Sequence, residues 1–376
     1  MDQIWKDNQS WIDETWEKIT VKLRRNSELL KHKLPSVSEN GVYNDRSVDA
    51  ISSWTNGFWP GIMWLMYAAT GENCFRETAE NGEEALDGAL EHYNWLHHDV
   101  GFMWHISAGA NYRLTGNEKS RNRNLYAAAT LASRYNVDGQ FIKAWNDVGT
   151  EGWVIIDCML NIPLLYWAEK ETNNIAFRQI ADHHAQKTMA HHIRPDGSVY
   201  HVVEYDVHTG EVVGYPWTQG YDGVHSSWAR GQAWAIYGFV LAYIHTGNQE
   251  YLDTAKKVAH YFIANVCTTD YVPLHDFRAP KEPVYIDTSS GAIAACGLIE
   301  IAKAVPEFEK KMYMQAALNI MKALTEKHCD FSKEEQSILQ NSSGFYGKEV
   351  HRPFIYGEYY YVEAMYKLKG FDVLFW

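Results

Sequence analysis

Two aspartates stand out as residues that could carry acid–base chemistry. Asp157 lies inside an almost unbroken apolar run (Trp153–Ala168, WVIIDCMLNIPLLYWA), and Asp99 belongs to the segment HHDVGFMW (His97–Trp104). Because an ionised carboxylate among apolar side chains is costly, Asp157 must be paired, hydrogen-bonded or protonated. A carboxyl group that keeps its proton near neutral pH can act as a general acid. The alternatives are structural: Asp157 bonds nearby backbone, and Asp99 caps a helix that begins near Gly101.

Aromatic residues that could hold a sugar ring occur beside these aspartates and in other short clusters. Trp54 begins WTNGFWPG, Trp145 lies in FIKAWND and Trp234 ends SSWARGQAW. The chain has 15 Trp and 24 Tyr, a surplus typical of sugar-binding proteins, although core packing is the competing explanation. Arg230, between the tryptophans of the third cluster, is suited to bidentate capture of a carboxylate; the alternative is a surface Arg bonded to a hairpin.

Other polar residues indicate an organic substrate rather than a metal centre. The loop NSSGFYGKEVHRP contains Ser342, Ser343 and Lys348, and could bind a phosphate or sulfate or be only a loop. The adjacent His97 and His98 are a poor start for a metal site, since neighbouring histidines rarely converge on one ion. No nucleophile-elbow, dinucleotide or phosphate-loop motif is present, so we expect no metal and no cofactor.

Composition limits the partners and the compartment. The chain has 34 basic and 47 acidic residues, a net charge of −13, which argues against nucleic acid or an anionic membrane as a partner. Its 5 cysteines are far apart and include no CxxC pair, which favours a reducing compartment. The acidic start MDQIWKDNQSWIDETW does not resemble a signal peptide, so we expect a cytoplasmic protein.

The elements that position these residues are helices. Apolar segments alternate with amphipathic ones, and similar turn phrases follow the apolar members: ATGENC, RLTGNEKS, KETNNIAF and IHTGNQEY. The pattern predicts helices at about 3–26, 58–70, 74–93, 103–115, 118–135, 153–171, 174–193, 227–246, 249–265, 288–304, 309–327 and 357–369. Paired as hairpins with the apolar member inward, they predict an all-α fold, an (α/α)6 barrel; an open α-solenoid is the alternative.

Few strands are expected. Alternating residues at 199–214 predict a β-hairpin that decorates a helix connection, and a second strand is possible at 271–277. No linker or shift in composition divides the chain, so we expect one catalytic domain over 1–376.

The motifs quoted above resemble, in order along the chain, those of the unsaturated glucuronyl hydrolases, glycoside hydrolase family 88. The resemblance covers nearly the whole chain and is carried by TNGFW, HHDVGF, AWND, IIDCMLNIPLL, the YH and TQG pairs, WARGQAW and IYGEYYYVEAM. It implies an (α/α)6 barrel, in agreement with the hairpin pattern. It also implies addition of water across the C4=C5 double bond of an unsaturated uronate, the terminal sugar that polysaccharide lyases leave.

The resemblance further implies roles for individual residues. Asp157 would protonate C4 and then act as base, and Asp99 would support the water, Asp157 or the substrate hydroxyls. The tryptophans Trp54, Trp145 and Trp234 would line the sugar subsites. The polar residues His98, His201, Gln219 and Arg230 would meet the uronate carboxylate, hydroxyls or water. Some members bind a sulfate with a Ser- and Lys-containing motif, and Ser342, Ser343 and Lys348 are similar to it, which leads to the hypothesis that sulfated unsaturated disaccharides are accepted.

Three other functions compete with this reading. An unsaturated rhamnogalacturonyl hydrolase would share the barrel and the chemistry but act on pectin fragments. A carbohydrate-binding protein without activity would keep the aromatic residues but would not need Asp157. A sugar epimerase of the same fold would be expected to pair histidines as bases, whereas this chain offers Asp99 and Asp157.

Overall fold

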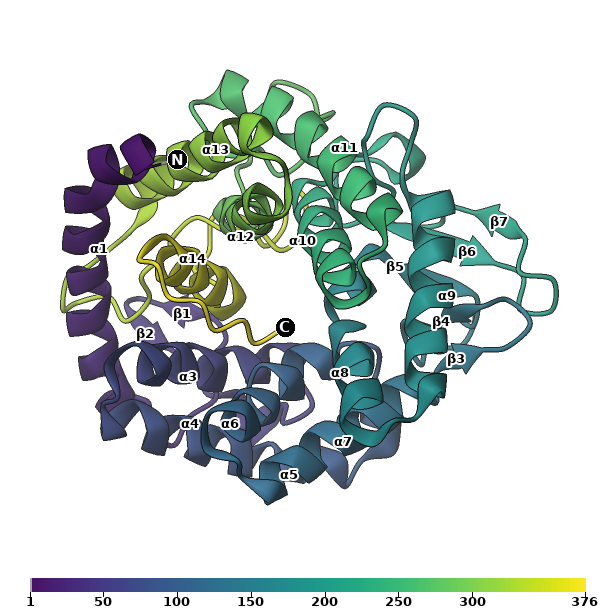
Figure 1. Cartoon of the computed structure of the whole chain (residues 1–376), viewed down its shortest axis with the longest axis horizontal. Helices are drawn as coiled ribbons and strands as arrows, with labels where there is room; N and C mark the ends of the chain where they lie inside the picture. Colours follow the sequence, from purple (N-terminus) through teal and green to yellow (C-terminus); the bar gives the residue numbers. More distant parts are fainter. Residues whose placement is uncertain (1) are drawn as a thin grey trace.

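Two concentric layers of helices make up the protein. A computed structural model describes residues 2–376, with side chains from residue 6 onward, so residue 1 of the expected domain lies outside it. Figure 1 shows the layers around a central axis. The inner layer contains α3 (Phe58–Thr70), α6 (Ala108–Thr115), α8 (Pro163–Thr172), α10 (Ala229–Thr246), α12 (Thr288–Ala304) and α14 (Ile355–Leu368). The outer layer contains α1 (Asp2–Leu29), α4 (Asn73–Ala85), α7 (Glu118–Ala132), α9 (Ile175–His192), α11 (Gln249–Val266) and α13 (Glu307–His328). The predicted all-α (α/α)6 barrel is confirmed.

Hydrophobicity decides which helix of each hairpin lies inside. In α12 every residue from Thr288 to Ala302 is buried, and in α10 every residue from Ala229 to Ala242 is buried. The outer helix α11 instead buries one stripe, including Tyr251, Ala255 and Phe262. A helix that is apolar all round is stable only when protein surrounds it, whereas a one-sided helix can face water.

The repeated turn phrases form the hairpin turns. Inner helices α3, α6, α8 and α10 end at residues in the left-handed conformation, with φ between 55° and 73°: Gly71, Gly116, Asn173 and Gly247. Glycine, and less often asparagine, adopts this conformation at little cost. In three turns the next residue caps the outer helix by accepting a backbone N–H at its side chain: Asn117, Asn174 and Asn248. The sequence repeat therefore encodes a tight reversal of direction.

The ring is closed by the two ends of the chain. Helix α14 packs between α12 and α3 in the inner layer, and α1 covers α14 and α4 from outside, as Figure 1 shows. The main hydrophobic core runs through the molecule, with buried residues from Ile12 to Trp376, and two smaller clusters form beside the strands, around Val154 and Ile155. This closure excludes the open solenoid.

Three predicted helices are wrong in part. The run expected as helix 153–171 begins as strand β5 (Trp153–Ile155), continues as the 3-10 turn η4 (Ile156–Leu160) and becomes α8 only at Pro163. Proline suits the first helical turn, and β-branched residues before it suit a strand. The expected helix 103–115 begins instead as a π turn, η3 (Gly101–His105), and becomes α6 only at Ala108. The expected helix 74–93 stops at Ala85, before the short α5 (Asp87–Leu90).

Small sheets decorate the barrel. The hairpin predicted at 199–214 is present as β6 (Val202–Tyr205) and β7 (Val212–Gly214), and β5 pairs antiparallel with β6. Two further pairs are β1 (Ser38–Glu39) with β2 (Val42–Tyr43), and β3 (Tyr135–Asn136) with β4 (Phe141–Ile142). The segment 271–277 forms only isolated bridges, not the strand considered there. The remaining short elements are α2 (Arg46–Asp49), η1 (Trp54–Gly57), η2 (Tyr93–Trp95), η5 (Gly223–His225) and η6 (Cys267–Thr269). Among residues 2–376, none of the helices combines the length and the apolarity needed to cross a bilayer.

Candidate active site

Asp157 lies at a change of direction between a strand and an inner helix. It is in η4, and the strand before it is fixed by pairing of Ile155 with Val202 and by the bond from Ile156 N–H to the His201 carbonyl (3.0 Å). Its sequence neighbours Ile156 and Cys158 are fully buried, whereas 21% of the Asp157 side chain is exposed. The Asp157 carboxylate is therefore not sealed inside the core, unlike the side chains on either side of it.

Asp99 is held against Asp157 by Asn161. The Asn161 side-chain amide donates to Asp99 Oδ1 (3.1 Å) and to the Asp157 carbonyl (3.3 Å), and its Oδ1 accepts the Phe102 N–H (3.0 Å). Asp99 was considered as a helix cap, but its carboxylate contacts Asn161 and lies 3.3 and 3.4 Å from ring nitrogens of His97 and His98. Asn161 is a functional candidate that the sequence reasoning missed, although it stands inside the quoted IIDCMLNIPLL block.

Burial sets the protonation of this pair. Burial raises the pKa of Asp157 to about 7, and the positive charge of Arg230 opposes the rise. The pKa of Asp99 lies well above its ordinary value because the group is buried and because ionised Asp157 repels a second negative charge; Asn161 and Arg134 act in the other direction. The two carboxyl groups therefore keep a proton near neutral pH, which is the condition for general-acid chemistry.

His201, Gln219 and Arg230 form a chain of contacts that leads away from Asp157. His201 Nδ1 accepts the Gln219 backbone N–H (3.0 Å), so its proton sits on Nε2, which lies 3.7 Å from Asp157 Oδ1. Burial, followed by the charge of Arg230, holds the pKa of His201 well below its usual range, and the ring is neutral. Gln219 Oε1 in turn accepts a hydrogen bond from Arg230 (2.8 Å).

Arg230 is fixed on several sides by the protein. Besides Gln219, it donates to Asp287 Oδ2 (3.0 Å) and to the carbonyls of Ser343 (2.5 Å) and Gly344 (3.0 Å). Its guanidinium also lies over the ring of Tyr356, 5.1 Å from the centroid. Because protein groups occupy its N–H donors, Arg230 acts on a ligand mainly through its positive charge and through Gln219.

A cavity of about 270 Å³ adjoins this chain of contacts. Trp54, Gln219, Arg230 and Tyr356 line it. The rings of Trp54 and Tyr356 are stacked, with centroids 5.0 Å apart and planes 29° apart. The site therefore combines polar donors with an aromatic wall, which is the composition that sugar binding requires.

Two more of the predicted tryptophans differ in their surroundings. Trp145 is partly exposed and packs on Trp217 (5.2 Å), whose ring lies 5.1 Å from His201. Trp234 is fully buried, and its ring centroid lies 5.3 Å from that of Phe102 and 5.4 Å from that of Tyr360. It therefore supports the site by packing inside the core. Trp217 was missed by the sequence reasoning, although it stands two residues before Gln219 in YPWTQG.

The three residues of the expected sulfate loop do not point their side chains toward one common anion site. The Ser342 hydroxyl pairs with Thr288 Oγ1 (2.9 Å), and the Ser343 hydroxyl donates to the Ile286 carbonyl (2.7 Å); both serines are fully buried. Lys348 is exposed. The serines hold the loop in place, and Lys348 is the member whose side chain is accessible to an anion.

One group of potential metal ligands coincides with the site. His97, His98 and Asp99 each present one donor atom within 4.8 Å of the others. Burial lowers the pKa of His97 to about 4 and that of His98 well below its usual range, so both rings are neutral. The three residues are consecutive, so the donor set is compact. The Asp99 carboxylate, however, already accepts a hydrogen bond from Asn161, so one of the potential metal ligands is used within the protein.

Comparisons with known proteins place this arrangement in a family. The model of Glycosyl Hydrolase Family 88 matches residues 26–375. The chain belongs to glycosyl hydrolase family 88. This family 88 protein is therefore a glycoside hydrolase, and the resemblance stated from the motifs is confirmed.

Relatives of this family 88 hydrolase are similar over nearly their whole length. It is 36% identical to the unsaturated glucuronyl hydrolase of Bacillus sp. (strain GL1), covering 94% of this chain and 95% of that protein. It is 33% identical to the unsaturated chondroitin disaccharide hydrolase of Streptococcus pneumoniae, covering 97% and 93%. The solved structure of the unsaturated glucuronyl hydrolase from Streptococcus agalactiae superposes with a TM-score of 0.89 at 31% identity, covering 97% of this chain and 93% of that one.

Proposed function

We propose that this hydrolase removes the unsaturated glucuronate from the non-reducing end of lyase-generated glycosaminoglycan oligosaccharides. The observation that supports the proposal most is an aspartic acid, Asp157, whose pKa of about 7 lets it carry a proton. Its carboxylate lies 3.7 Å from His201, which is linked through Gln219 to the cavity that Gln219 and Arg230 line. The named relatives act, by their names, on unsaturated glucuronyl and chondroitin disaccharide substrates. An unsaturated disaccharide of this class offers an electron-rich alkene to that proton.

In the proposed reaction Asp157 is first the acid and then the base. Asp157 transfers its proton to C4, and positive charge develops at C5, shared with the ring oxygen. The resulting Asp157 carboxylate and Asp99 stabilise that charge, and Asp157 takes one proton from the water that attacks C5. The hydroxyl at C5 then becomes a ketone as the C5–ring oxygen bond breaks. The open C1 hemiacetal expels the remaining sugar and leaves an aldehyde, so one water is consumed.

Binding of the uronate carboxylate falls to the chain of polar contacts beside Asp157. Because Gln219 Oε1 is bound to Arg230, the Gln219 amide has only N–H groups to offer a further partner. We assign these N–H groups, polarised by the Arg230 charge, to the carboxylate, and His201 Nε2–H to the water or a hydroxyl near Asp157. The indoles of Trp54 and Trp145 line the sugar subsites, and Trp234 supports the floor.

Three further assignments complete the proposal. One catalytic domain covers 1–376, and its partners are unsaturated uronate-containing saccharides rather than nucleic acid, in keeping with the net charge of −13. A cytoplasmic location is supported by the 5 free cysteines, since unpaired cysteines are typical of a reducing compartment. In the proposed reaction the carboxyl pair supplies and accepts the protons, so no metal or cofactor is assigned to it.

The decisive experiment follows the loss of the ultraviolet absorbance of the conjugated double bond. We expect wild type to remove the absorbance of an unsaturated chondroitin disaccharide, and Asp157→Asn to be slower by ~10²–10⁴-fold. Asp253→Asn, an exposed aspartate on the outer helix α11, is the matched control and should be as active as wild type. Absorbance that persists with wild type would show a binding protein without activity. Faster turnover of an unsaturated rhamnogalacturonan disaccharide would show the pectin alternative.

A further inference from the structure

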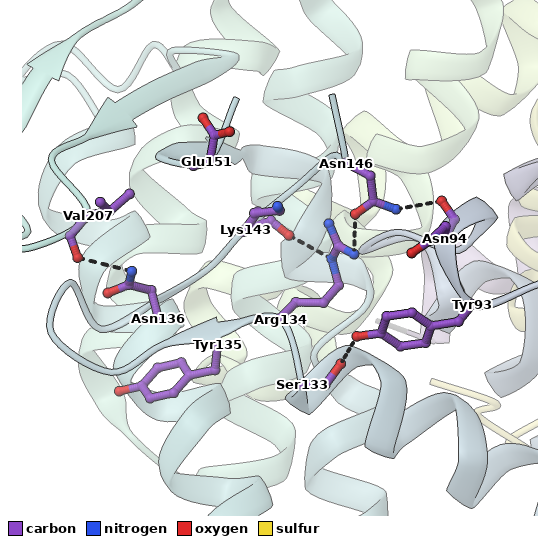
Figure 2. Close-up of a pocket in the computed structure, with 10 residues that line it drawn as sticks. All are labelled: Tyr93, Asn94, Ser133, Arg134, Tyr135, Asn136, Lys143, Asn146, Glu151 and Val207. Atoms are coloured by element: carbon purple, nitrogen blue, oxygen red, sulfur yellow. Dashed lines mark hydrogen bonds between the residues drawn. The ribbon is translucent and has the colours of Figure 1, made fainter. Parts of the chain in front are cut away.

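Arg134 forms a crosslink behind the active site. It follows helix α7, and its guanidinium makes five hydrogen bonds to backbone carbonyls and one side chain: Lys143 O (2.9 Å), Asn146 Oδ1 (2.8 Å), Leu96 O (3.4 Å), Ala144 O (2.9 Å) and Trp145 O (3.0 Å). A guanidinium has five N–H donors, so these five hydrogen bonds use all of them. Figure 2 shows Arg134 with dashed lines to two of these partners, Lys143 and Asn146.

The acceptors belong to two segments that both lead into the active site. Leu96 directly precedes His97, His98 and Asp99, whereas residues 143–146 contain Trp145. Asn146 repeats the link: its amide donates to the carbonyls of Asn94 (2.9 Å) and Leu96 (2.8 Å). The two segments are also joined directly by a backbone hydrogen bond from the His98 N–H to the Ala144 carbonyl (3.2 Å), so Arg134 and Asn146 reinforce a contact that the backbone makes once.

We propose that Arg134 is a positioning residue for the reaction, fixing Asp99 and Trp145 relative to each other from outside the substrate cavity. This inference rests on the proposed function of the chain. The cavity beside Arg134, about 520 Å³, is lined by Tyr93, Asn136, Lys143 and Glu151 among others, and shares no lining residue with the cavity of Trp54 and Arg230. Arg134 therefore acts through the residues that it holds.

The charge of Arg134 adds a second effect. It lowers the pKa of Asp99 and of both neighbouring histidines, His97 and His98. Arg134 interacts with the charges of three titratable groups, Cys158, Tyr93 and Asp99. Asp99 in turn interacts with the charge of Asp157 and lies against His97 and His98. The guanidinium is the cation among these groups, so its loss makes Asp99 and the histidines hold protons more tightly.

Three variants separate geometry from charge. We expect Arg134→Gln to lower kcat about tenfold or more and to move to higher pH the ionisation of Asp99 in the pH–rate profile. Arg134→Lys keeps the charge, but one ammonium cannot replace a five-donor fork; it should lower kcat and leave the profile in place. Asn146→Ala cuts only the second link, and should lower kcat less, again without moving the profile. The matched control is Arg76→Gln, which alters a surface pair with Glu80 on α4.

Activity is measured as loss of absorbance of an unsaturated chondroitin disaccharide, together with the melting temperature of each variant. A wild-type kcat and pH profile in Arg134→Gln, or a lower melting temperature alone, would overturn the positioning role. If Arg134→Gln does not fold, Asn146→Ala still decides, because wild-type kcat in that variant contradicts the crosslink. Inactivity of wild type and Arg76→Gln alike would instead count against the proposed function.

Discussion

Asn161 donates a hydrogen bond of 3.1 Å from its side-chain amide to the Oδ1 atom of Asp99. The same amide nitrogen lies 3.3 Å from the carbonyl oxygen of Asp157, the residue that we assign as the acid. One fully buried side chain thus fixes the position of one active-site aspartate against the backbone of the other. This relationship leads to the first prediction.

Replacing Asn161 by alanine should leave Asp99 without its amide donor and the Phe102 N–H without its acceptor. We expect kcat to fall at least tenfold and the free energy of unfolding to fall by about 1–3 kcal/mol, since buried polar groups lose their partners. Kinetics on an unsaturated disaccharide and urea denaturation measure both. Asn319→Ala, on the outer helix α13, is the control; equal kcat values in the two variants would contradict the role of Asn161.

Gly101 makes room for this contact, so Gly101→Ala should have a similar effect. A Cβ at this position would lie 2.6 Å from Asn161 Oδ1 and 2.7 Å from its Cα, and backbone cannot yield to that overlap as a flexible side chain could. We expect a lower melting temperature and a loss of kcat that follows the displacement of Asn161. The matched substitution Gly214→Ala meets open space and should behave as wild type in both measurements.

The pKa of Asp157 predicts how activity depends on pH. Its folded-state pKa is raised to about 7, so the proton needed at C4 is present below pH 7 and is lost as the pH rises through that value. We therefore expect kcat/KM to fall about tenfold per pH unit well above pH 7, as for a single required acid. A flat profile from pH 6 to about 9 would exclude Asp157 as the acid.

The same shift has a consequence for stability. Asp157 ionises near its ordinary value in the unfolded chain but near 7 in the folded one, so it makes folding less favourable as the pH rises between these values. Asp157→Asn removes this loss, and its melting temperature should exceed that of wild type at pH 8 more than at pH 5. Thermal denaturation at the two pH values tests this; a lower melting temperature at pH 8 would argue against a destabilising carboxylate.

Lys348 carries the hypothesis of sulfate tolerance, because the Ser342 and Ser343 hydroxyls are engaged in the protein. In Lys348→Ala the turnover ratio of sulfated to unsulfated unsaturated disaccharides should fall about two- to fivefold, the size expected for an exposed charge pair. Lys333→Ala, another exposed lysine, should leave the ratio unchanged. An unchanged ratio in Lys348→Ala would remove this residue from substrate selection.

Local sequence pattern was enough to predict the barrel and to propose most of the residues of the candidate site. Hydrophobic periodicity separates inner from outer helices because burial of a helix face is a local property of the chain, and Gly71, Gly116, Asn173 and Gly247 mark reversals that few residues can make. The apolar neighbours of Asp157 likewise predicted a raised pKa. Periodicity did not reveal that the run containing Asp157 is a strand and a turn, since a short apolar run has no distinct period.

Which acid with a raised pKa belongs to the candidate site follows from the folded arrangement, because local pattern does not distinguish Asp157 from Glu358. Glu358 also has a pKa of about 7, raised by burial, but it is fully buried and accepts hydrogen bonds from Tyr43 (2.8 Å) and Ile338 (2.7 Å). Asp157 instead lies beside His201 and near Arg230, with Asp99 held to it by Asn161. These residues come from separate hairpins, and closure of the ring fixes the distances between them, which local sequence pattern does not contain.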